Sequence, residues 1–481
     1  MKLYLLLGML LVSQSSIAQV FIHRAAPFEH ISEGDIVSAD IDNDGDLDIL
    51  LSGIEPSGLP ITKLYTNDGL GVFMEVPNTT FTGAYLASAV FADVNGDNAP
   101  DIFLSGIDSS NFYFTKLYIN NGVGIFIEKV NTNIKNIQGT IAVADVDGDN
   151  DQDMFQIGFS NTLIRTSTLY ENDGNGNFTE IQSGVFRGFD DAKAVFGDVD
   201  GDNDLDLIIS GYGISPTISS WLYNNDGNGN FTEVSVPFEG VTDGSIALVD
   251  INGDNFLDFI ETGFGNSWKG ITKTYINNGL GTFTEITNTL EQVRRSKIAV
   301  GDYDKDGDED LVLTGINSSY NLVGKLYEND GTGIFTEQPN ENIQDVSHAV
   351  IAFIDIDKDS DLDLIVGGNN ANGNPSTRFY LNRLITTSLD ELNNNDKLNI
   401  QLTPNPADER VNIHLNIKKR GKKTILIHDI NGRLVYQSER LVNSGDVIIP
   451  LEIGYLSQGV YFVQITGKEI TNTKGVRLIV Y

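Results

Sequence analysis

One short acidic motif, repeated seven times at a nearly constant spacing, constrains the fold of this 481-residue chain more than any other feature. Each copy is a nonapeptide with Asp at positions one, five and nine, and with Asp or Asn at position three. The copies are DIDNDGDLD from Asp40, DVNGDNAPD from Asp93, DVDGDNDQD from Asp145, DVDGDNDLD from Asp198, DINGDNFLD from Asp250, DYDKDGDED from Asp302 and DIDKDSDLD from Asp355. Their starts lie 53, 52, 53, 52, 52 and 53 residues apart. Self-similarity at a fixed period predicts an array of like structural units.

Each unit contains four short segments with the composition of β-strands. Small and apolar residues precede the acidic loop, and an apolar segment ending near Gly follows it, as in LDLIISG at 205–211. After a variable loop come a segment such as KLYTND at 63–68, a Gly-rich turn and a segment such as NFTEV at 230–234. No segment shows a helical period of useful length. Four strands in about 52 residues are typical of one blade of a β-propeller.

The two ends of the array indicate that it closes into a ring. The seventh unit stops after RFYLN at 378–382 and lacks its Gly-rich turn and fourth strand. Residues 21–40 align without gaps on residues 231–250, so the chain begins with a lone fourth strand. Closure removes the exposed strand edges that an open array would keep. We therefore predict an all-β chain with a seven-bladed β-propeller over 19–384, whose N-terminal strand completes the last blade.

The N-terminal residues have the pattern of a signal peptide. Lys2 precedes an apolar run at 3–12, and the small residues Ser16 and Ala18 predict cleavage after Ala18. The alternative for residues 1–18 is a buried N-terminal helix. The run is too short for a stable membrane anchor, and no other stretch is apolar enough, so we expect no integral membrane span.

Charge and composition restrict the partners. The formal net charge is −36, which disfavours nucleic acid and anionic membranes, so we expect no nucleic-acid partner. The chain has no Cys and therefore no disulfide. Residues 385–399 are polar and are predicted to form a linker. Residues 400–481 have a basic excess and short alternating strands between Gly-containing turns, which predict a second domain, an immunoglobulin-like β-sandwich.

The acidic loops have the residue pattern of calcium loops. Several carboxylates in one turn repel each other unless a cation lies between them, and alternating oxygen ligands suit a hard cation. Position seven includes Ala99 and Phe256, so any ligand there is a backbone carbonyl. Mg²⁺ rarely uses all-protein cages, and the absence of Cys and of His from the loops argues against zinc. The alternative is a set of solvated acidic turns.

We predict up to seven Ca²⁺ ions, one per blade. The candidate ligands, loop by loop, are Asp40, Asp42, Asp44, Asp46 and Asp48; Asp93, Asn95, Asp97, Ala99 and Asp101; Asp145, Asp147, Asp149, Asp151 and Asp153; Asp198, Asp200, Asp202, Asp204 and Asp206; Asp250, Asn252, Asp254, Phe256 and Asp258; Asp302, Asp304, Asp306, Asp308 and Asp310; and Asp355, Asp357, Asp359, Asp361 and Asp363.

These loops, together with a Ser-Gly or Thr-Gly pair after the next strand, resemble FG-GAP/VCBS repeats, the family that includes the propeller of integrin α-subunits. The pairs begin at Ser52, Ser105, Ser210, Thr262 and Thr314. The resemblance implies a seven-bladed propeller with calcium in the loop between the first two strands of a blade. The third copy departs from the pattern at Ile157-Gly158 and the seventh at Gly367-Gly368. Every unit carries the loop here, unlike in integrins, so integrin-type ligand binding is not implied.

The C-terminal residues resemble the sorting domain of type IX secretion substrates in Bacteroidetes. The matching segments are TPNPADERVNIHL at 403–415, IHDINGRLVY at 427–436, LSQGVYFVQI at 456–465 and KGVRLIVY at 474–481. Thr403 stands where an aromatic residue often precedes Pro-Asn-Pro. The resemblance implies the type IX secretion machinery as a partner, export across the outer membrane, and a secreted or cell-surface location.

Catalytic motifs are not evident, so the sequence favours a binding or adhesion module over an enzyme. The variable loops lie on the face opposite the acidic loops and carry aromatic residues that suit an extracellular glycan or protein ligand, or that pin the loops by local packing. The candidate ligand-binding residues are Phe112, Tyr113, Phe114, Tyr212, Trp221, Trp268, Lys269 and Tyr320. The alternatives are a polysaccharide lyase or glycoside hydrolase on this face, with Lys269 or Arg165 as proton acceptor, and a structural layer protein.

Overall fold

The computed structural model describes two compact units, residues 20–383 and 400–480. Short gaps in the description fall at 183, 214–216, 340, 404–406, 408, 418–420, 430–432, 444 and 468–475. The predicted signal peptide, residues 1–18, and the predicted linker, residues 385–399, lie outside the described residues. All elements of the described residues are strands, which confirms the predicted all-β class. Accordingly, no helix in this part of the chain has the length and apolarity to cross a membrane.

The first unit contains seven four-stranded antiparallel sheets. From the innermost to the outermost strand, they are β2 (Ser32–Ala39), β3 (Asp48–Ile54), β4 (Pro60–Asn67) and β5 (Phe73–Glu75); β6 (Tyr85–Ala92), β7 (Asp101–Ile107), β8 (Tyr113–Asn120) and β9 (Phe126–Lys129); β10 (Ile137–Ala144), β11 (Asp153–Ser160), β12 (Arg165–Asn172) and β13 (Phe178–Ile181); β14 (Asp190–Gly197), β15 (Asp206–Tyr212), β16 (Ile218–Asn225) and β17 (Phe231–Val234); β18 (Thr242–Val249), β19 (Asp258–Phe264), β20 (Gly270–Asn277) and β21 (Phe283–Ile286); β22 (Val293–Gly301), β23 (Asp310–Asn317), β24 (Leu322–Asn329) and β25 (Phe335–Glu337); and β26 (Ser347–Ile354), β27 (Asp363–Asn369), β28 (Pro375–Leu381) and β1 (Ile22–Arg24).

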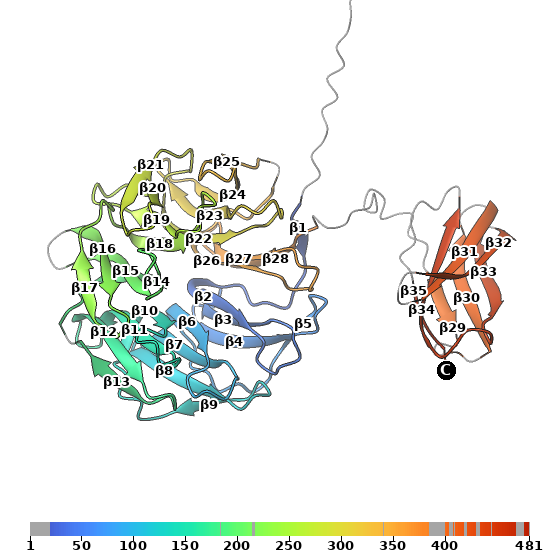
Figure 1. Cartoon of the computed structure of the whole chain (residues 1–481), viewed down its shortest axis with the longest axis horizontal. Coiled ribbons are helices and arrows are strands. Elements are labelled where there is room, and N and C mark those ends of the chain that lie inside the picture. The colour runs from blue at the N-terminus through green and yellow to red at the C-terminus, as the bar shows by residue number, and fades with distance from the viewer. Residues whose placement is uncertain are drawn as a thin grey trace, which may run out of the picture. The chain divides into compact units, whose positions relative to one another are not determined.

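The sheets form a ring, as Figure 1 shows. Each innermost strand contacts the innermost strand of the next sheet, and β26 contacts β2, so the circle is closed. The seventh sheet takes its outermost strand from the other end of the unit: β1 pairs antiparallel with β28, with Ile22 opposite Leu381. The N-terminal strand therefore occupies the place that the alignment of residues 21–40 assigns to it.

Apolar packing between neighbouring sheets forms the core of the ring. The second strand of every sheet is buried on both faces, which explains its continuous apolar sequence, as in Ile49-Leu50-Leu51. One cluster joins the first and seventh sheets and contains Phe28, Tyr65 and Phe379. Burial of such side chains contributes about 1.5–3 kcal/mol each, so closure of the ring is stabilised by the same packing as its other joints.

A Tyr-x-Asn sequence at the end of each third strand ties each sheet to its neighbour. In all seven sheets the Asn amide donates one hydrogen bond to a backbone carbonyl in the preceding sheet, at 2.7–2.9 Å. The first sheet uses Asn67, which donates to the carbonyl of Ile356 in the seventh sheet. The Tyr hydroxyl accepts a backbone N–H from the segment that precedes the same sheet, as between Tyr65 and Glu29. These bonds recur because the repeat places them identically.

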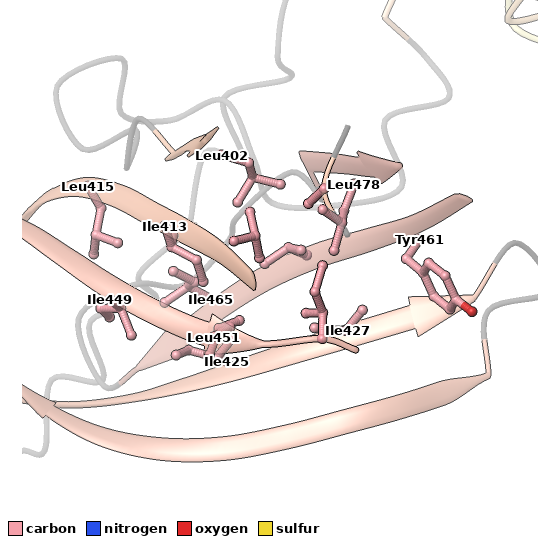
Figure 2. Packing of buried hydrophobic residues seen from close by; sticks show 14 of the residues in the cluster. Leu402, Ile413, Leu415, Ile425, Ile427, Ile449, Leu451, Tyr461, Ile465 and Leu478 are labelled. Carbon is pink, nitrogen blue, oxygen red and sulfur yellow. The ribbon is translucent and has the colours of Figure 1, made fainter. Parts of the chain in front are cut away.

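The second unit has two sheets that share one apolar core. The strands are β29 (Ile400–Thr403), β30 (Arg410–Ile417) and β33 (Gly445–Glu452) in the first sheet, and β32 (Leu434–Val442), β31 (Gly421–Asp429), β34 (Gly459–Gly467) and β35 (Val476–Val480) in the second. Figure 2 shows that Ile413 and Leu451 of the first sheet and Ile425 and Ile465 of the second point into a common interior. The alternation of apolar and polar residues along these strands places every second side chain in this core.

Candidate metal centres

The seven acidic loops all connect the first and second strands of their sheets, at one face of the ring. We call this the loop face. Each loop is wound by hydrogen bonds between its own side chains and backbone, because position five accepts the N–H of position seven in all seven copies, as Asp44 does from Asp46 at 2.9 Å. The position-one carboxylate accepts the N–H of position six, as Asp40 does from Gly45. The carboxylates at positions one and five therefore fold back onto the backbone of their own loop.

Positions four and six adopt left-handed backbone conformations in every loop, with φ between 60° and 98°. Gly or Asn occupies most of these positions, as expected for residues that enter this region at low cost. Three positions in the last two loops differ, and Lys305, Lys358 and Ser360 nevertheless have φ of 62°, 60° and 71°. The winding of the loop therefore holds these residues in a strained conformation.

Carboxylate oxygens converge in five of the seven loops. In each of these loops, one oxygen from each of three Asp side chains lies within 4.8 Å of the others. The five groups are Asp40, Asp42 and Asp48; Asp145, Asp147 and Asp153; Asp198, Asp200 and Asp206; Asp302, Asp304 and Asp306; and Asp355, Asp357 and Asp359. The second and fifth loops, with Asn95 and Asn252 at position three, form no such group of three acidic residues among the described residues.

Buried carboxylate oxygens without hydrogen-bond donors test whether a cation fits these loops. Such oxygens occur in four of the five groups, on Asp40, Asp200, Asp302, Asp355 and Asp357. An unpaired buried acceptor is costly, and a buried charge more so, unless a cation compensates it. The donor set consists of oxygens alone, which suits a hard divalent cation such as Ca²⁺. The five groups therefore fit a bound cation, and the calcium ion would neutralise the repulsion between the carboxylates.

The pKa values at position three agree with this fit. Burial, followed by the neighbouring carboxylates, raises the pKa of Asp42, Asp147, Asp200 and Asp357 above the ordinary value of an aspartate. For Asp304, burial and then Asp306 raise the pKa to about 6. Without a cation, the ionised form of these aspartates is destabilised, and a bound ion would remove this destabilisation.

Position seven points its side chain away from the centre in most loops. The Asp46 carboxylate lies against Gly69 in the turn between the third and fourth strands, where a Cβ on the glycine would come within 2.5 Å of it. Asp151, Asp204, Asp308 and Phe256 lie against the corresponding glycines in the same way. The residue type at this position is therefore free to vary.

Asp361 is the exception at position seven. It lies in the seventh unit, which lacks the Gly-rich turn, and its side chain is fully buried. Both of its carboxylate oxygens lack hydrogen-bond donors, and burial followed by Asp359 raises its pKa to about 7. The seventh loop therefore differs from the others in having a fully buried position-seven carboxylate with no hydrogen-bond donor.

Position nine has a structural task in every sheet besides any contact with a cation. The Asp48 carboxylate accepts the N–H of Ile41 at 3.2 Å and the N–H of Asn67 at 2.9 Å, and all seven copies repeat this pair of bonds. Burial raises the pKa of this residue in each loop, to about 6 for Asp48 and about 8 for Asp363. Position nine thus fastens the loop to the end of the third strand.

The variable loops lie on the face opposite the loop face, and we call it the variable face. The candidate ligand-binding residues of these loops differ in how far they are exposed. Phe112, Trp268 and Tyr320 are 63%, 61% and 79% exposed, and Lys269 is also exposed. Tyr113 and Tyr212 are half-buried. The prediction that Phe114 binds a ligand is wrong, because its side chain is only 5% exposed and packs in the core between the first two sheets.

Trp221 and the residues that replace it in other sheets support the scaffold. The Arg187 guanidinium lies 3.7 Å from the centre of the Trp221 ring and also pairs with Glu233. The equivalent Lys63 pairs with Glu29 and Glu75, and Lys116, Lys273 and Lys325 form similar pairs. Trp221 is therefore covered by an arginine instead of being presented to a ligand.

A line of aromatic and arginine side chains crosses the variable face over four sheets. We call it the aromatic ridge, and in order it comprises Phe159, Arg165, Tyr212, Trp268, Phe264, Arg294 and Tyr320. Successive members lie 4.9–6.1 Å apart. Sequence reasoning missed Phe159, Phe264 and Arg294, because they lie on strands and not in the variable loops.

Two sequence families match the chain. The secretion system C-terminal sorting domain matches residues 401–480, and the FG-GAP-like repeat matches residues 40–104, 93–156 and 302–366. The chain therefore carries FG-GAP-like repeats followed by a type IX sorting domain, as the motifs in its sequence predict. It is an exported protein with a secreted or outer-surface location.

Two of the solved structures that resemble this chain are distant likenesses. A family 43 arabinoxylan arabinofuranohydrolase from Bacillus subtilis is 12% identical, with 94% of this chain and 95% of that chain covered and a TM-score of 0.29. An arginine-to-alanine triple variant of AofleA from Arthrobotrys oligospora is 8% identical, with 76% and 88% covered and a TM-score of 0.37. Neither likeness is close enough to support an argument about this chain. A search of curated proteins finds no match.

Proposed function

We propose that this chain is an exported, calcium-stabilised seven-bladed β-propeller that binds an extracellular glycan through its variable face. In this proposal residues 1–18 are a signal peptide, 19–384 the propeller, 385–399 a linker, and 400–481 an immunoglobulin-like sorting domain that the type IX machinery recognises. Up to seven Ca²⁺ ions occupy the acidic loops. The three-carboxylate groups support five of these ions most directly, and four of the five groups also contain unpaired buried oxygens.

The aromatic ridge is the observation that carries the binding role. Trp268 and Tyr320 are large, exposed rings, and Arg294 and Phe264 lie between them and hold their spacing. Exposed rings arranged in a row are suited to stacking on the apolar faces of successive sugar residues. A flexible polysaccharide can follow such a row across several sheets, which favours a glycan ligand.

The structure weighs against Arg165 as the proton acceptor of a lyase. Its guanidinium donates to Asp190 at 2.9 Å and lies between the rings of Phe159 and Tyr212. A guanidinium group has donors and no acceptor, and here it is held between a carboxylate and two rings. Arg165 therefore acts as part of the ridge.

Binding to a panel of soluble polysaccharides tests the proposal. Trp268→Ala and Tyr320→Ala should each weaken binding about tenfold, the loss expected for one stacked ring at the centre of a contact. Leu280→Ala is the matched control, because Leu280 is 73% exposed on the fifth sheet but belongs to a turn on the loop face. Failure of the wild-type protein to bind any polysaccharide in the presence of Ca²⁺ would refute the glycan role.

A further inference from the structure

A second site lies on the axis of the ring. The seven innermost strands together line a cavity of about 360 Å³. Every innermost strand runs from the variable face to its acidic loop on the loop face, and the cavity is lined by residues near the start of each strand. The cavity therefore lies toward the variable face, on the same side as the aromatic ridge.

Backbone bulges direct side chains into this cavity. In six of the seven sheets the pairing between the first and second strands shifts register at this level. In each shift one residue has a left-handed conformation, with φ between 42° and 54°. The six residues are Glu33, Leu86, Asp191, Asp243, Arg295 and His348, and all six line the cavity. Bulges re-aim side chains in this manner beside functional sites.

The cavity lining differs in chemistry from sheet to sheet. The loops, the Tyr-x-Asn sequences and the position-nine aspartates are the same in every sheet, because the architecture requires them. In the cavity, by contrast, Asp35 of the first sheet pairs with Lys297 of the sixth at 3.3 Å, and Asp243 of the fifth pairs with Arg295 of the sixth at 3.4 Å. The same repeat positions carry other residue types elsewhere in the ring: Ser88 of the second sheet stands at the position of Asp35 and Lys297, and Leu86 stands at the position of Asp243 and Arg295.

Some polar groups in the cavity remain available to a ligand. Lys193 forms no ion pair within the part of the chain that the structure describes, although it faces Asp191 and Asp243 as well as Lys297. Burial lowers the pKa of Lys193 and raises the pKa of Asp191. The wall formed by the second and third sheets carries no charge and presents Ser88 and Gln138.

The mixture of groups selects the class of ligand. A simple anion would meet Glu33, Asp35, Asp191 and Asp243, and a simple cation would meet Lys193, Arg295 and Lys297. Hydroxyl groups avoid both conflicts, because each one donates to a carboxylate and accepts from an ammonium group. The volume holds roughly a dozen water-sized groups at about 30 Å³ each, which matches one sugar residue.

We propose that this cavity binds a neutral, polyhydroxylated ligand, namely a single sugar residue at the end of a saccharide chain. The ridge leads to the cavity, since Arg294 of the ridge precedes Arg295 of the cavity, and Asp190, which pairs with Arg165 of the ridge, precedes Asp191. The proposal takes its ligand class from the proposed function but depends on separate residues.

Binding of short saccharides, measured by calorimetry on the full chain in Ca²⁺, tests the proposal. The probes are the methyl glycosides of glucose, galactose, mannose, xylose and arabinose, with glucuronate and galacturonate as anionic probes. Lys193→Met removes the unpaired ammonium group, and Gln138→Trp fills the cavity from its uncharged wall. Each should weaken binding of a neutral glycoside about tenfold or more. Lys116→Met is the control, because Lys116 is an ion-paired lysine on β8, the third strand of its sheet. This change should alter the binding of a neutral glycoside less than about twofold.

The outcomes separate the two proposals. The cavity proposal is overturned if no neutral glycoside binds, if the anionic sugars bind as tightly as the neutral ones, or if binding survives both cavity variants. Polysaccharide binding that depends on Trp268 would then leave the proposed function standing. Conversely, glycoside binding that requires Lys193, with polysaccharide binding unchanged in Trp268→Ala, would support the cavity and refute the ridge. If Lys193→Met fails to fold, Gln138→Trp provides the same test.

Discussion

Removal of an asparagine that joins two sheets should destabilise the ring by an amount that the hydrogen bonds define. Asn67 donates to the carbonyls of Ile356 at 2.8 Å and Leu47 at 3.2 Å, and its own side-chain oxygen accepts no bond. Asn67→Ala therefore leaves two carbonyl acceptors without this donor. Each such loss costs about 1–3 kcal/mol, and the longer bond lies at the lower end. We expect a decrease of about 2–4 kcal/mol in the free energy of unfolding.

A second asparagine makes the comparison quantitative. Asn225 donates to Val146 at 2.8 Å and Leu205 at 3.3 Å, and its side-chain oxygen also accepts no bond. Asn67→Ala acts at the joint where the first and seventh sheets close the ring, whereas Asn225→Ala acts at an internal joint. If the ring is closed in solution, the two losses should agree within about 1 kcal/mol.

Urea unfolding in saturating Ca²⁺ measures both losses from the shift in midpoint at constant slope. Asn228→Ala is the control, because Asn228 is exposed in a turn and donates only locally, to Asp226. It should change stability by less than about 0.5 kcal/mol. A loss near zero for Asn67→Ala, with a full loss for Asn225→Ala, would refute the closed ring.

Further predictions concern metal, charge, strain and export. Excess chelator should lower the melting temperature strongly, because each site filled at 100 times its Kd adds about 2.7 kcal/mol; an unchanged transition would contradict the metal assignment. Glu261 is fully buried, and burial raises its pKa above the ordinary value of 4.5. The protonated side chain therefore stabilises the folded protein below pH 4.5, and this contribution is lost as the pH rises through the raised pKa. Melting temperature against pH in saturating Ca²⁺ should therefore fall less steeply in Glu261→Gln than in the wild type, and identical slopes would contradict this. Ser360→Gly should stabilise the calcium-free protein by about 0.5–1 kcal/mol in urea, because relief of a left-handed conformation (about 1–2 kcal/mol) exceeds the added entropy cost of glycine; a loss of stability would show that Ser360 is unstrained. Deletion of residues 400–481 should leave the protein inside the cell envelope by fractionation, and normal export of the deleted form would contradict the sorting role.

The repeated features of this protein could be read from the sequence because they follow from period and residue type. The seven loops, the four strands per unit and the place of the N-terminal strand opposite Leu381 all depend on patterns within single units. The sequence also excludes side-chain ligands at position seven of two loops, because Ala99 and Phe256 stand there. The structure adds the reason, since these side chains lie against or near the glycines of the neighbouring turn.

Features that arise between units could not be read in this way. Phe114 looks like a loop aromatic in the sequence, but strand β8 begins at Tyr113 and carries Phe114 into the core. The ridge joins side chains from four sheets, and the cavity joins side chains from all seven. The register shifts that turn Asp191 and Arg295 inward depend on pairing with the second strand. The contacts that join different sheets, such as Tyr212 with Trp268 and Asp35 with Lys297, have no signal within one repeat.

Calcium content measured on the purified protein tests the central claim most directly. The full chain would be equilibrated with Ca²⁺ and Mg²⁺ together, freed of loose ions, and analysed by elemental mass spectrometry against protein concentration. The account predicts at least five tightly held calcium ions per chain, one for each group of three carboxylates, and no more than seven. Protein that retains no calcium, or that retains magnesium in its place, would contradict it.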